Sequence, residues 1–213
     1  MPVALPIVDI YGKYKLPENL QLHMLRVAAL AQYISKNWSG PPINTQMLIR
    51  VLLVHDIGNI VKIESGSEEF KRVQEKTLAR FGKDDHRVTA AIAKELGFSM
   101  EEVELLNNKI FVENESTFAS NDYNRKIAAY ADQRVAPTGV MQLSERLHEA
   151  KERYKDKPGS SMNNPRTDSL ITYALKIERQ IQQFCRITLE SISDVTIAAD
   201  LENLKEYRLL CPS

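Results

Sequence analysis

The stretch Val51-Leu52-Leu53-Val54-His55-Asp56-Ile57-Gly58-Asn59 places a histidine and an aspartate at the end of an apolar run. Met47, Val51 and His55 are four residues apart, so a helix through them puts the His55 imidazole on the face of the core residues. A buried imidazole beside a buried carboxylate is costly unless both find polar partners. A divalent metal ion is the simplest shared partner. The alternative is a core histidine bonded to a carbonyl group, with Asp56 capping the next segment.

The composition is that of an ordinary globular protein. Its 213 residues suffice for one domain with a core, or for one domain with an extension. The 28 basic residues balance the 28 acidic ones, so we expect no electrostatic binding to nucleic acid or to a membrane. Only two cysteines are present, far from the His-Asp pair, and we find neither a signal peptide nor an apolar membrane span. These features favour a cytoplasmic protein.

Helical periodicity covers most of the chain, without a strand pattern of useful length. Pro2 and Pro6 oppose a helix, so we expect residues 1–16 to form an extended arm. Capping residues, glycines and prolines divide the remainder into eight or nine helices. Their approximate ranges are 17–39, 44–55, 67–81, 85–96, 99–112, 122–136, 139–155, 168–191 and 194–209. The sequence therefore predicts an all-α fold, with a polar lid or surface loop at 113–121.

Residues 157–165 are rich in proline, glycine, serine and asparagine and give the strongest linker signal. We expect this stretch to separate a helical core with its N-terminal arm, residues 1–156, from a C-terminal helical extension, residues 157–213. The extension is expected to pack on the core. An alternative use of its helices is a dimer interface, so a homodimer is left open.

Three of the predicted helices carry an ionisable group on an apolar face. His23 lies in the inward series of the first long helix, and Asp132 lies on an alanine-rich face of a later one. Small side chains around Asp132 leave room for an ion and a substrate. The separations are 32 residues from His23 to His55 and 76 residues from Asp56 to Asp132.

This order of a histidine, a His-Asp pair and a distant aspartate resembles the HD superfamily of metal-dependent phosphohydrolases. Its three signatures are matched by His23-Met24-Leu25-Arg26-Val27-Ala28, Leu52-Leu53-Val54-His55-Asp56-Ile57-Gly58-Asn59 and Ala129-Tyr130-Ala131-Asp132. The resemblance covers roughly residues 20–135. It implies a helical core with one divalent metal ion held by His23, His55, Asp56 and Asp132. Such a mixed nitrogen and oxygen set suits Mn, Fe, Co, Ni, Zn or Mg, which activates water and offsets phosphoryl charge.

Three further residues are candidates for substrate binding. Arg26 lies one helical turn from His23 and could hold a phosphate by two hydrogen bonds. Lys62 lies on the loop that follows the His-Asp pair, and His86 begins a helix whose N-terminus attracts anions. Each also fits a surface or salt-bridged residue.

Two residues near the His-Asp pair are candidates for the catalytic step. Glu64 lies eight residues after Asp56, where several relatives place a catalytic carboxylate, so the resemblance implies a proton carrier; a surface loop residue is the alternative. Asn59 departs from the Glu, His or Lys that many relatives carry at this position. An amide orients water or phosphate but transfers no proton.

The resemblance therefore implies an enzyme that hydrolyses a small phosphate ester, with a nucleotide monophosphate as the leading substrate. A cyclic dinucleotide, a guanosine polyphosphate and a non-nucleotide phosphate are alternatives on the same scaffold. A regulatory helical module with a structural metal is an alternative of another class. An open coordination position would favour the enzyme over that module.

Overall fold

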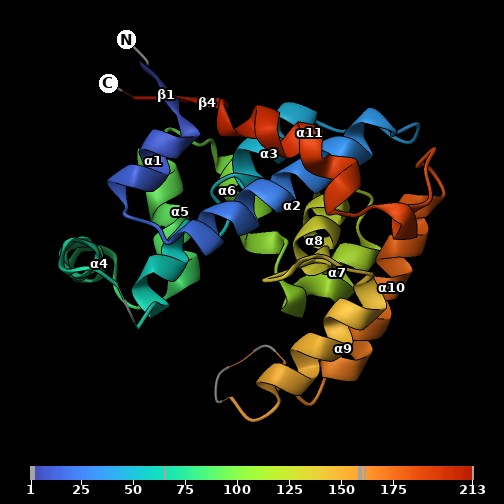
Figure 1. Ribbon diagram of the computed structural model, residues 1–213. Helices are drawn as coiled ribbons and strands as arrows, with labels where there is room; N and C mark the ends of the chain where they lie inside the picture. Colours follow the sequence, from blue (N-terminus) through green and yellow to red (C-terminus); the bar gives the residue numbers. More distant parts are fainter. Residues whose placement is uncertain (1–2, 65, 158–159, 161, 213) are drawn as a thin grey trace.

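The computed structural model is mostly helical and describes residues 3–64, 66–157, 160 and 162–212. Eleven α-helices lie within these residues, as Figure 1 shows. They are α1 (Ile7–Lys13), α2 (Glu18–Lys36), α3 (Thr45–Leu52), α4 (Glu68–Phe81), α5 (Asp85–Glu95), α6 (Met100–Asn108), α7 (Asn114–Ala119), α8 (Tyr123–Arg134), α9 (Leu143–Tyr154), α10 (Thr167–Gln182) and α11 (Asp194–Lys205). The predicted all-α fold class is confirmed. None of the described helices has both the length and the apolar character that a membrane crossing needs.

The centre of the fold is formed by α2, α3 and α8, which carry or adjoin the predicted ligands. α2 packs against α3, α8 and α11 (Figure 1). Alanines of α2 and α8, including Ala28, Ala31, Ala128 and Ala131, are completely buried between them. Because these side chains are small, the helices approach closely, and polar groups on neighbouring positions come within contact distance.

The chain turns immediately after α3, which ends at Leu52 instead of continuing through His55 as the spacing predicts. A short 3₁₀ helix, η1 (Ile57–Lys62), then packs against α5. Gly58 lies so close to α5 that an added Cβ would overlap the Asp85 carbonyl oxygen and come within 2.6 Å of the Thr89 backbone nitrogen. The Gly58 N–H also donates to Thr89 Oγ1 at 3.0 Å. This contact fixes the turn that presents His55.

The prediction that residues 1–16 form an extended N-terminal arm is largely wrong. Only β1 (Val3–Pro6) is extended, and α1 follows it directly. Pro6 immediately precedes the first helical residue, where the missing N–H of proline costs no helical hydrogen bond. The Tyr11 side chain of α1 is buried, and its hydroxyl donates to the Leu53 carbonyl at 2.6 Å. α1 therefore helps to hold the turn after α3. Met1 and Pro2 lie outside the described residues.

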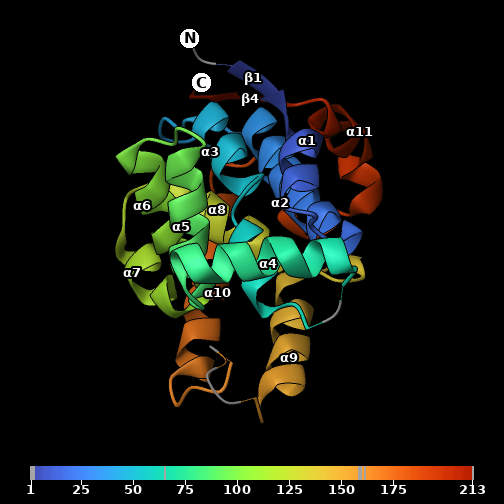
Figure 2. The same ribbon diagram turned by 90° about the vertical axis from the view of Figure 1, so that its left-hand side faces the viewer.

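Two small antiparallel pairings were not predicted from the sequence. β1 pairs with β4 (Arg208–Cys211), with Val3 opposite Cys211, so α11 ends at Lys205 and not near residue 209. This pairing brings the two ends of the chain together (Figures 1 and 2). β2 (Val135–Ala136) and β3 (Gly139–Val140) form a hairpin between α8 and α9.

The predicted lid or loop at residues 113–121 is instead η2 (Phe111–Glu113) followed by α7. Asn114 is completely buried, and its amide donates to Gln133 at 2.9 Å and to the Leu170 carbonyl at 3.2 Å. These bonds tie the segment to α8 and α10, so it is part of the packed structure.

The C-terminal helices make buried contacts with the central ones. α10 packs against α7, α8 and α9. It ends at Gln182, whereas the sequence predicted one helix over residues 168–191, and η3 (Leu189–Ser191) follows it. Arg134 of α8 is completely buried and donates to the carbonyl groups of Leu189 and Ile192 at 2.9 and 3.0 Å. In Figure 2, α9 and α10 extend from the end of the molecule opposite β1 and β4. Between them, residues 158, 159 and 161 of the predicted linker lie outside the described residues.

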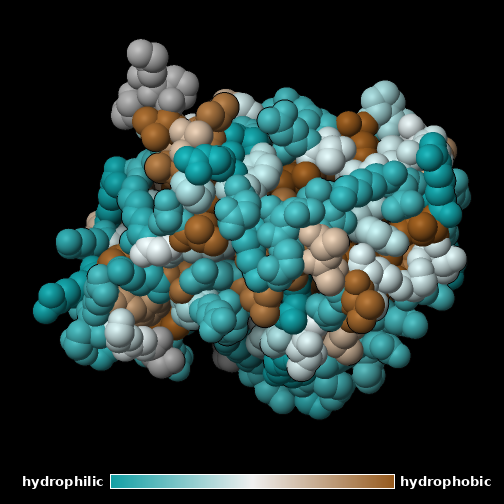
Figure 3. Space-filling view, turned by 45° about the horizontal axis from the view of Figure 1, so that its top comes forward, coloured by the Kyte–Doolittle hydropathy of each residue, from teal (hydrophilic) through white to brown (hydrophobic). Residues whose placement is uncertain are grey.

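The face shown in Figure 3 is mostly hydrophilic, and its apolar residues form small separate patches. Scattered single apolar side chains are normal on a protein surface. This face therefore gives no argument for an extended apolar docking surface.

Candidate metal centre and substrate pocket

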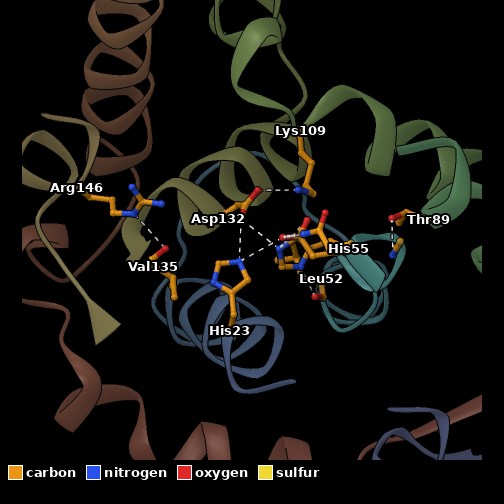
Figure 4. A network of polar contacts seen from close by, with 11 residues as sticks. His23, Leu52, His55, Thr89, Lys109, Asp132, Val135 and Arg146 are labelled. Carbon is orange, nitrogen blue, oxygen red and sulfur yellow. Dashed lines mark hydrogen bonds and ion pairs between the residues drawn. The ribbon is translucent and has the colours of Figure 1, made fainter. Parts of the chain in front are cut away.

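Four side chains from three parts of the chain converge at the centre of the fold. His23 projects from α2 and Asp132 from the last turn of α8, whereas His55 and Asp56 project from the turn after α3. Figure 4 shows His23, His55 and Asp132 pointing toward one another. The ligand atoms of His23, His55 and Asp56 all lie within 4.8 Å of one another. Asp132 Oδ1 lies 3.4 Å from His23 Nε2 and 3.2 Å from His55 Nε2.

The orientation of His55 is set by the backbone of the turn. Its side chain is completely buried, and Nδ1 lies 2.6 Å from the Leu52 carbonyl oxygen. A carbonyl oxygen only accepts hydrogen bonds, so the proton must be on Nδ1, and in the neutral imidazole Nε2 carries a lone pair. That lone pair faces the carboxylate oxygens of Asp56 and Asp132, at 3.7 and 3.2 Å. In the neutral form of His55 acceptor therefore faces acceptor at the 3.2 Å contact with Asp132, an arrangement that a bound cation would satisfy.

The spacing of these atoms fits a divalent metal ion. Nitrogen and oxygen ligands lie about 2.0–2.2 Å from such an ion, so adjacent ligand atoms are roughly 3.0–3.6 Å apart. The distances from the two Nε2 atoms to Asp132 Oδ1 fall in this range, and those to the Asp56 oxygens, both 3.7 Å, lie just above it. The spacing is therefore compatible with a divalent ion, and the assignment of all four residues as ligands stays a prediction.

A lysine that the sequence did not indicate adjoins this centre. Lys109, the C-cap of α6, is buried, and its ammonium group donates to Asp132 Oδ2 at 2.7 Å. Burial disfavours the charged form of Asp132, but the charge of Lys109 is the largest effect that opposes burial and holds the Asp132 pKa well below its usual range. Burial likewise opposes the Lys109 charge, yet Asp132 and Asp56 outweigh it and raise the Lys109 pKa. Asp132 therefore keeps Oδ1 for the centre and gives Oδ2 to the lysine.

Asn59 acts on the centre through Asp56. Its amide nitrogen donates to Asp56 Oδ2 at 2.9 Å, and its side chain lines the pocket described next. The amide therefore orients a predicted ligand, whereas the sequence suggested that it orients water or phosphate.

A pocket of about 440 Å³ opens on this centre. Its polar residues are His23, Asp56, Asn59, Asn19, Arg146, Arg153 and Tyr154, and its apolar residues are Pro17, Leu20, Ile63, Val135 and Pro137. A concave surface on which convergent polar groups lie beside apolar residues is a feature of small-ligand sites. The centre thus has an access route of ligand size.

Two arginines of α9 form the cationic part of this pocket. Arg146 donates from Nε to the Val135 carbonyl at 3.3 Å (Figure 4). Its Nη1 donates to Glu149 at 3.2 Å. Burial lowers the Arg146 pKa, and the negative charges of Glu149 and Asp132 oppose that shift. A guanidinium group stays charged at neutral pH even so. Arg153, one turn beyond Glu149, pairs with the same carboxylate.

The structure places the three predicted phosphate-binding residues outside the pocket lining. Arg26 donates from Nε to Asp194 Oδ1 at 2.8 Å and so joins α2 to α11. Lys62 pairs with Asp85 at 2.6 Å, and His86 is exposed in the first turn of α5. Glu64, the predicted proton carrier, is exposed after η1 and is also outside the lining residues.

Lys109, Arg146 and Arg153 were missed because no short motif contains them. Lys109 lies within the helix expected for residues 99–112, but α6 ends at Asn108 and Lys109 is its C-cap. Nothing in its spacing indicates burial beside Asp132. Arg146 and Arg153 are seven residues apart, which places them on one helix face. That spacing was the available signal, although an ordinary charged surface helix shows it too.

The comparisons with known proteins identify the family. The model of the HD domain matches residues 21–150, which is more than half of the chain and includes all four predicted ligands. Neither the curated proteins nor the solved structures gave a significant match.

Proposed function

Since the chain belongs to the HD-domain family of metal-dependent phosphohydrolases, we propose that it hydrolyses a small phosphate ester in the pocket beside His23 and Asp56. The sequence puts a nucleoside monophosphate first among these esters. The observation that carries the proposal is the His55 lone pair, which converges with His23 and two carboxylates where a ligand-sized pocket opens.

We assign the metal to His23, His55, Asp56 and Asp132. When bound, a divalent ion supplies a Lewis acid that makes water nucleophilic at neutral pH and offsets phosphoryl charge. His55 is held by the Leu52 carbonyl and Asp56 by Asn59, so both ligands keep their orientation without the ion. Supporting hydrogen bonds of this kind fix ligand geometry in metal sites.

Arg146 takes the phosphate-binding role that the sequence suggested for Arg26 and Lys62. It lines the pocket next to the centre, whereas Arg26 is bonded to Asp194. Within the described residues Arg146 Nη2 has no hydrogen-bond partner, so it is free to donate to a phosphoryl oxygen. A guanidinium group offsets the charge of the transferring phosphoryl group and aligns it for attack by water.

The reaction breaks the bond between phosphorus and the ester oxygen, and the water oxygen forms the new bond to phosphorus. One water proton ends on the leaving alcohol and the products are an alcohol and inorganic phosphate. Because the exposed side chain of Glu64 is not in the lining, the leaving oxygen is assigned its proton from solvent in the open pocket.

The shape of the pocket favours an enzyme over a structural metal site. His23 and Asp56 both line the pocket, so one side of the centre is open to a ligand. Structural metal sites are closed by protein ligands on all sides. Leu20, Ile63 and Pro137 offer an apolar surface for the sugar or base of a nucleotide.

The direct test is a phosphate-release screen over nucleotides, sugar phosphates and other phosphate esters, each with Mn, Fe, Co, Ni, Zn and Mg. Release that depends on the metal and is lost in Asp56→Ala supports the proposal. Lys151→Gln is the matched control, because Lys151 lies on α9 but pairs with Asp168 of α10, away from the pocket. A folded, metal-loaded protein that releases phosphate from none of these esters would refute it.

A further inference from the structure

We propose that Arg146 and Arg153 of α9 form a subsite for a second anionic group of the substrate, a phosphoryl or carboxylate group adjacent to the phosphoryl group that reacts. The inference rests on the proposed function, which places the reacting group at the metal centre. It deepens that function by naming the class of ester that the pocket accepts.

The two guanidinium groups are held side by side by one carboxylate. Glu149 lies between them on α9, and its Oε2 accepts from Arg146 Nη1 at 3.2 Å while its Oε1 accepts from Arg153 Nη2. Arg146 and Arg153 are seven residues apart, which is about two helical turns and therefore one face. The guanidinium carbon of Arg153 also lies 5.5 Å from the Tyr154 ring centroid. Both arginines are thus oriented before a ligand arrives.

The two arginines occupy different depths of the pocket. The Arg146 side chain is only 17% exposed, and the Asp132 carboxylate is close enough to act on its charge. Arg153 is 37% exposed and lies about two helical turns further along α9. A phosphoryl group at the centre therefore meets Arg146 first, and Arg153 lies beyond it.

The charge and the free donors of this wall leave room for a second anionic group. Two guanidinium groups against the single Glu149 carboxylate leave one excess positive charge. Each guanidinium has five N–H donors, and Glu149 uses only one from each arginine in the described structure. A second anionic group next to the reacting one can accept from the remaining donors of Arg153. Phosphate esters with such a group rank above simple nucleoside monophosphates in this pocket.

The test is ligand binding, measured by calorimetry on the protein with its bound metal. The three probes differ in their second anionic group. Inorganic phosphate has none, pyrophosphate has a second phosphoryl group, and phosphoglycolate has a carboxylate. We expect the wild type to prefer at least one of the latter two over phosphate by about tenfold or more, the worth of a charge-assisted hydrogen bond. Preference for pyrophosphate alone assigns a phosphoryl group, and preference for phosphoglycolate alone a carboxylate.

Arg153→Gln should lower that preference about tenfold, with little change in melting temperature. Lys151→Gln is the matched control, because its side chain has the same 37% exposure and the same charge on the same helix but faces α10. It should keep the preference. Equal binding of all three probes by the wild type, or an unchanged preference in Arg153→Gln, would overturn the subsite.

The binding measurement is independent of turnover. A preserved preference without phosphate release from any ester refutes the proposed function and leaves the anion subsite. Hydrolysis without the preference refutes the subsite alone.

Discussion

The two sides of the site differ in how their charged groups are held. The buried wall lies behind the pocket lining and is formed by α6, α8 and the turn after α3; there the His55 side chain is fully buried, and Lys109 is nearly so. Their partners are a backbone carbonyl and a carboxylate inside the protein. On the α9 wall, Arg146 and Arg153 share one partly exposed carboxylate.

This difference separates two tasks. Buried groups with fixed partners keep ligand atoms within tenths of an ångström, which a metal centre requires. Partly exposed guanidinium groups can exchange a carboxylate on the protein for an anion on a ligand at small cost, because exposed ion pairs contribute little to stability. We therefore expect substitutions on the buried wall to affect metal and fold, and those on the α9 wall to affect ligand affinity.

The largest expected effect is that of His55→Ala on metal content and turnover. Removing this imidazole takes away a ligand whose orientation depends on the Leu52 carbonyl. Elemental analysis should fall from about one divalent ion per chain to well below that, and phosphate release should be abolished. Retention of a full equivalent of metal would show that the buried wall does not hold the ion. Lys151→Gln should keep both metal and activity.

Lys109→Met should destabilise the metal-free protein by about 3–5 kcal/mol, because it leaves the Asp132 charge buried without its partner. The measurement is urea unfolding with and without a chelator. Metal should recover part of the loss in the variant, since the ion also neutralises Asp132. Equal stability of the metal-free variant and the metal-free wild type would show that the ion pair of Lys109 and Asp132 does not stabilise the folded protein.

The pH dependence of this loss follows from the two pKa shifts. Asp132 has a lowered pKa in the folded protein, so its contribution is present above its unfolded pKa of about 3.9 and is lost as the pH falls through the lowered value. Lys109 has a raised pKa, so its contribution is present below about 10.4 and is lost as the pH rises through the raised value. The difference between wild type and Lys109→Met should therefore be constant from about pH 6 to pH 9.

Gly58→Ala should destabilise the fold by about 1–3 kcal/mol, the usual cost of overpacking, and should also weaken metal binding. The added methyl group would overlap the backbone of α5, which cannot move as a flexible side chain can. Gly12→Ala is the matched control, because an added Cβ there meets no atom within 4 Å. Equal melting temperatures for the two variants would mean that the contact between η1 and α5 does not fix the turn.

Much of the buried wall could be predicted from the sequence because its residues follow local patterns. His23, His55, Asp56 and Asp132 lie on apolar helical faces in an order that resembles a known family, and the HD-domain match spans them. Even there, the end of α3 before His55 escaped prediction, because the turn depends on a tertiary contact of Gly58.

The remaining features depend on contacts between distant parts of the chain. Lys109 is next to Asp132 only because α6 packs on α8, and Arg26 is remote from the pocket only because α11 returns to α2 with Asp194. The pairing of β1 with β4 joins residues from opposite ends of the chain, and so no local pattern indicates it.

The smallest expected effect is that of Glu64→Gln on turnover. As a positioned acid–base group, the role that the sequence suggests, Glu64 would be worth a factor of about 10²–10⁴ in kcat. The structure instead places it exposed after η1 and outside the pocket lining, so we expect kcat to change less than about threefold. Steady-state kinetics on the best substrate of the screen measure this, with the metal content checked in parallel. A loss of a hundredfold or more at unchanged metal content would mean that the segment after η1 moves over the pocket when substrate binds. The pocket would then have a third, mobile wall, and the division between a metal-holding and a ligand-binding wall would be incomplete.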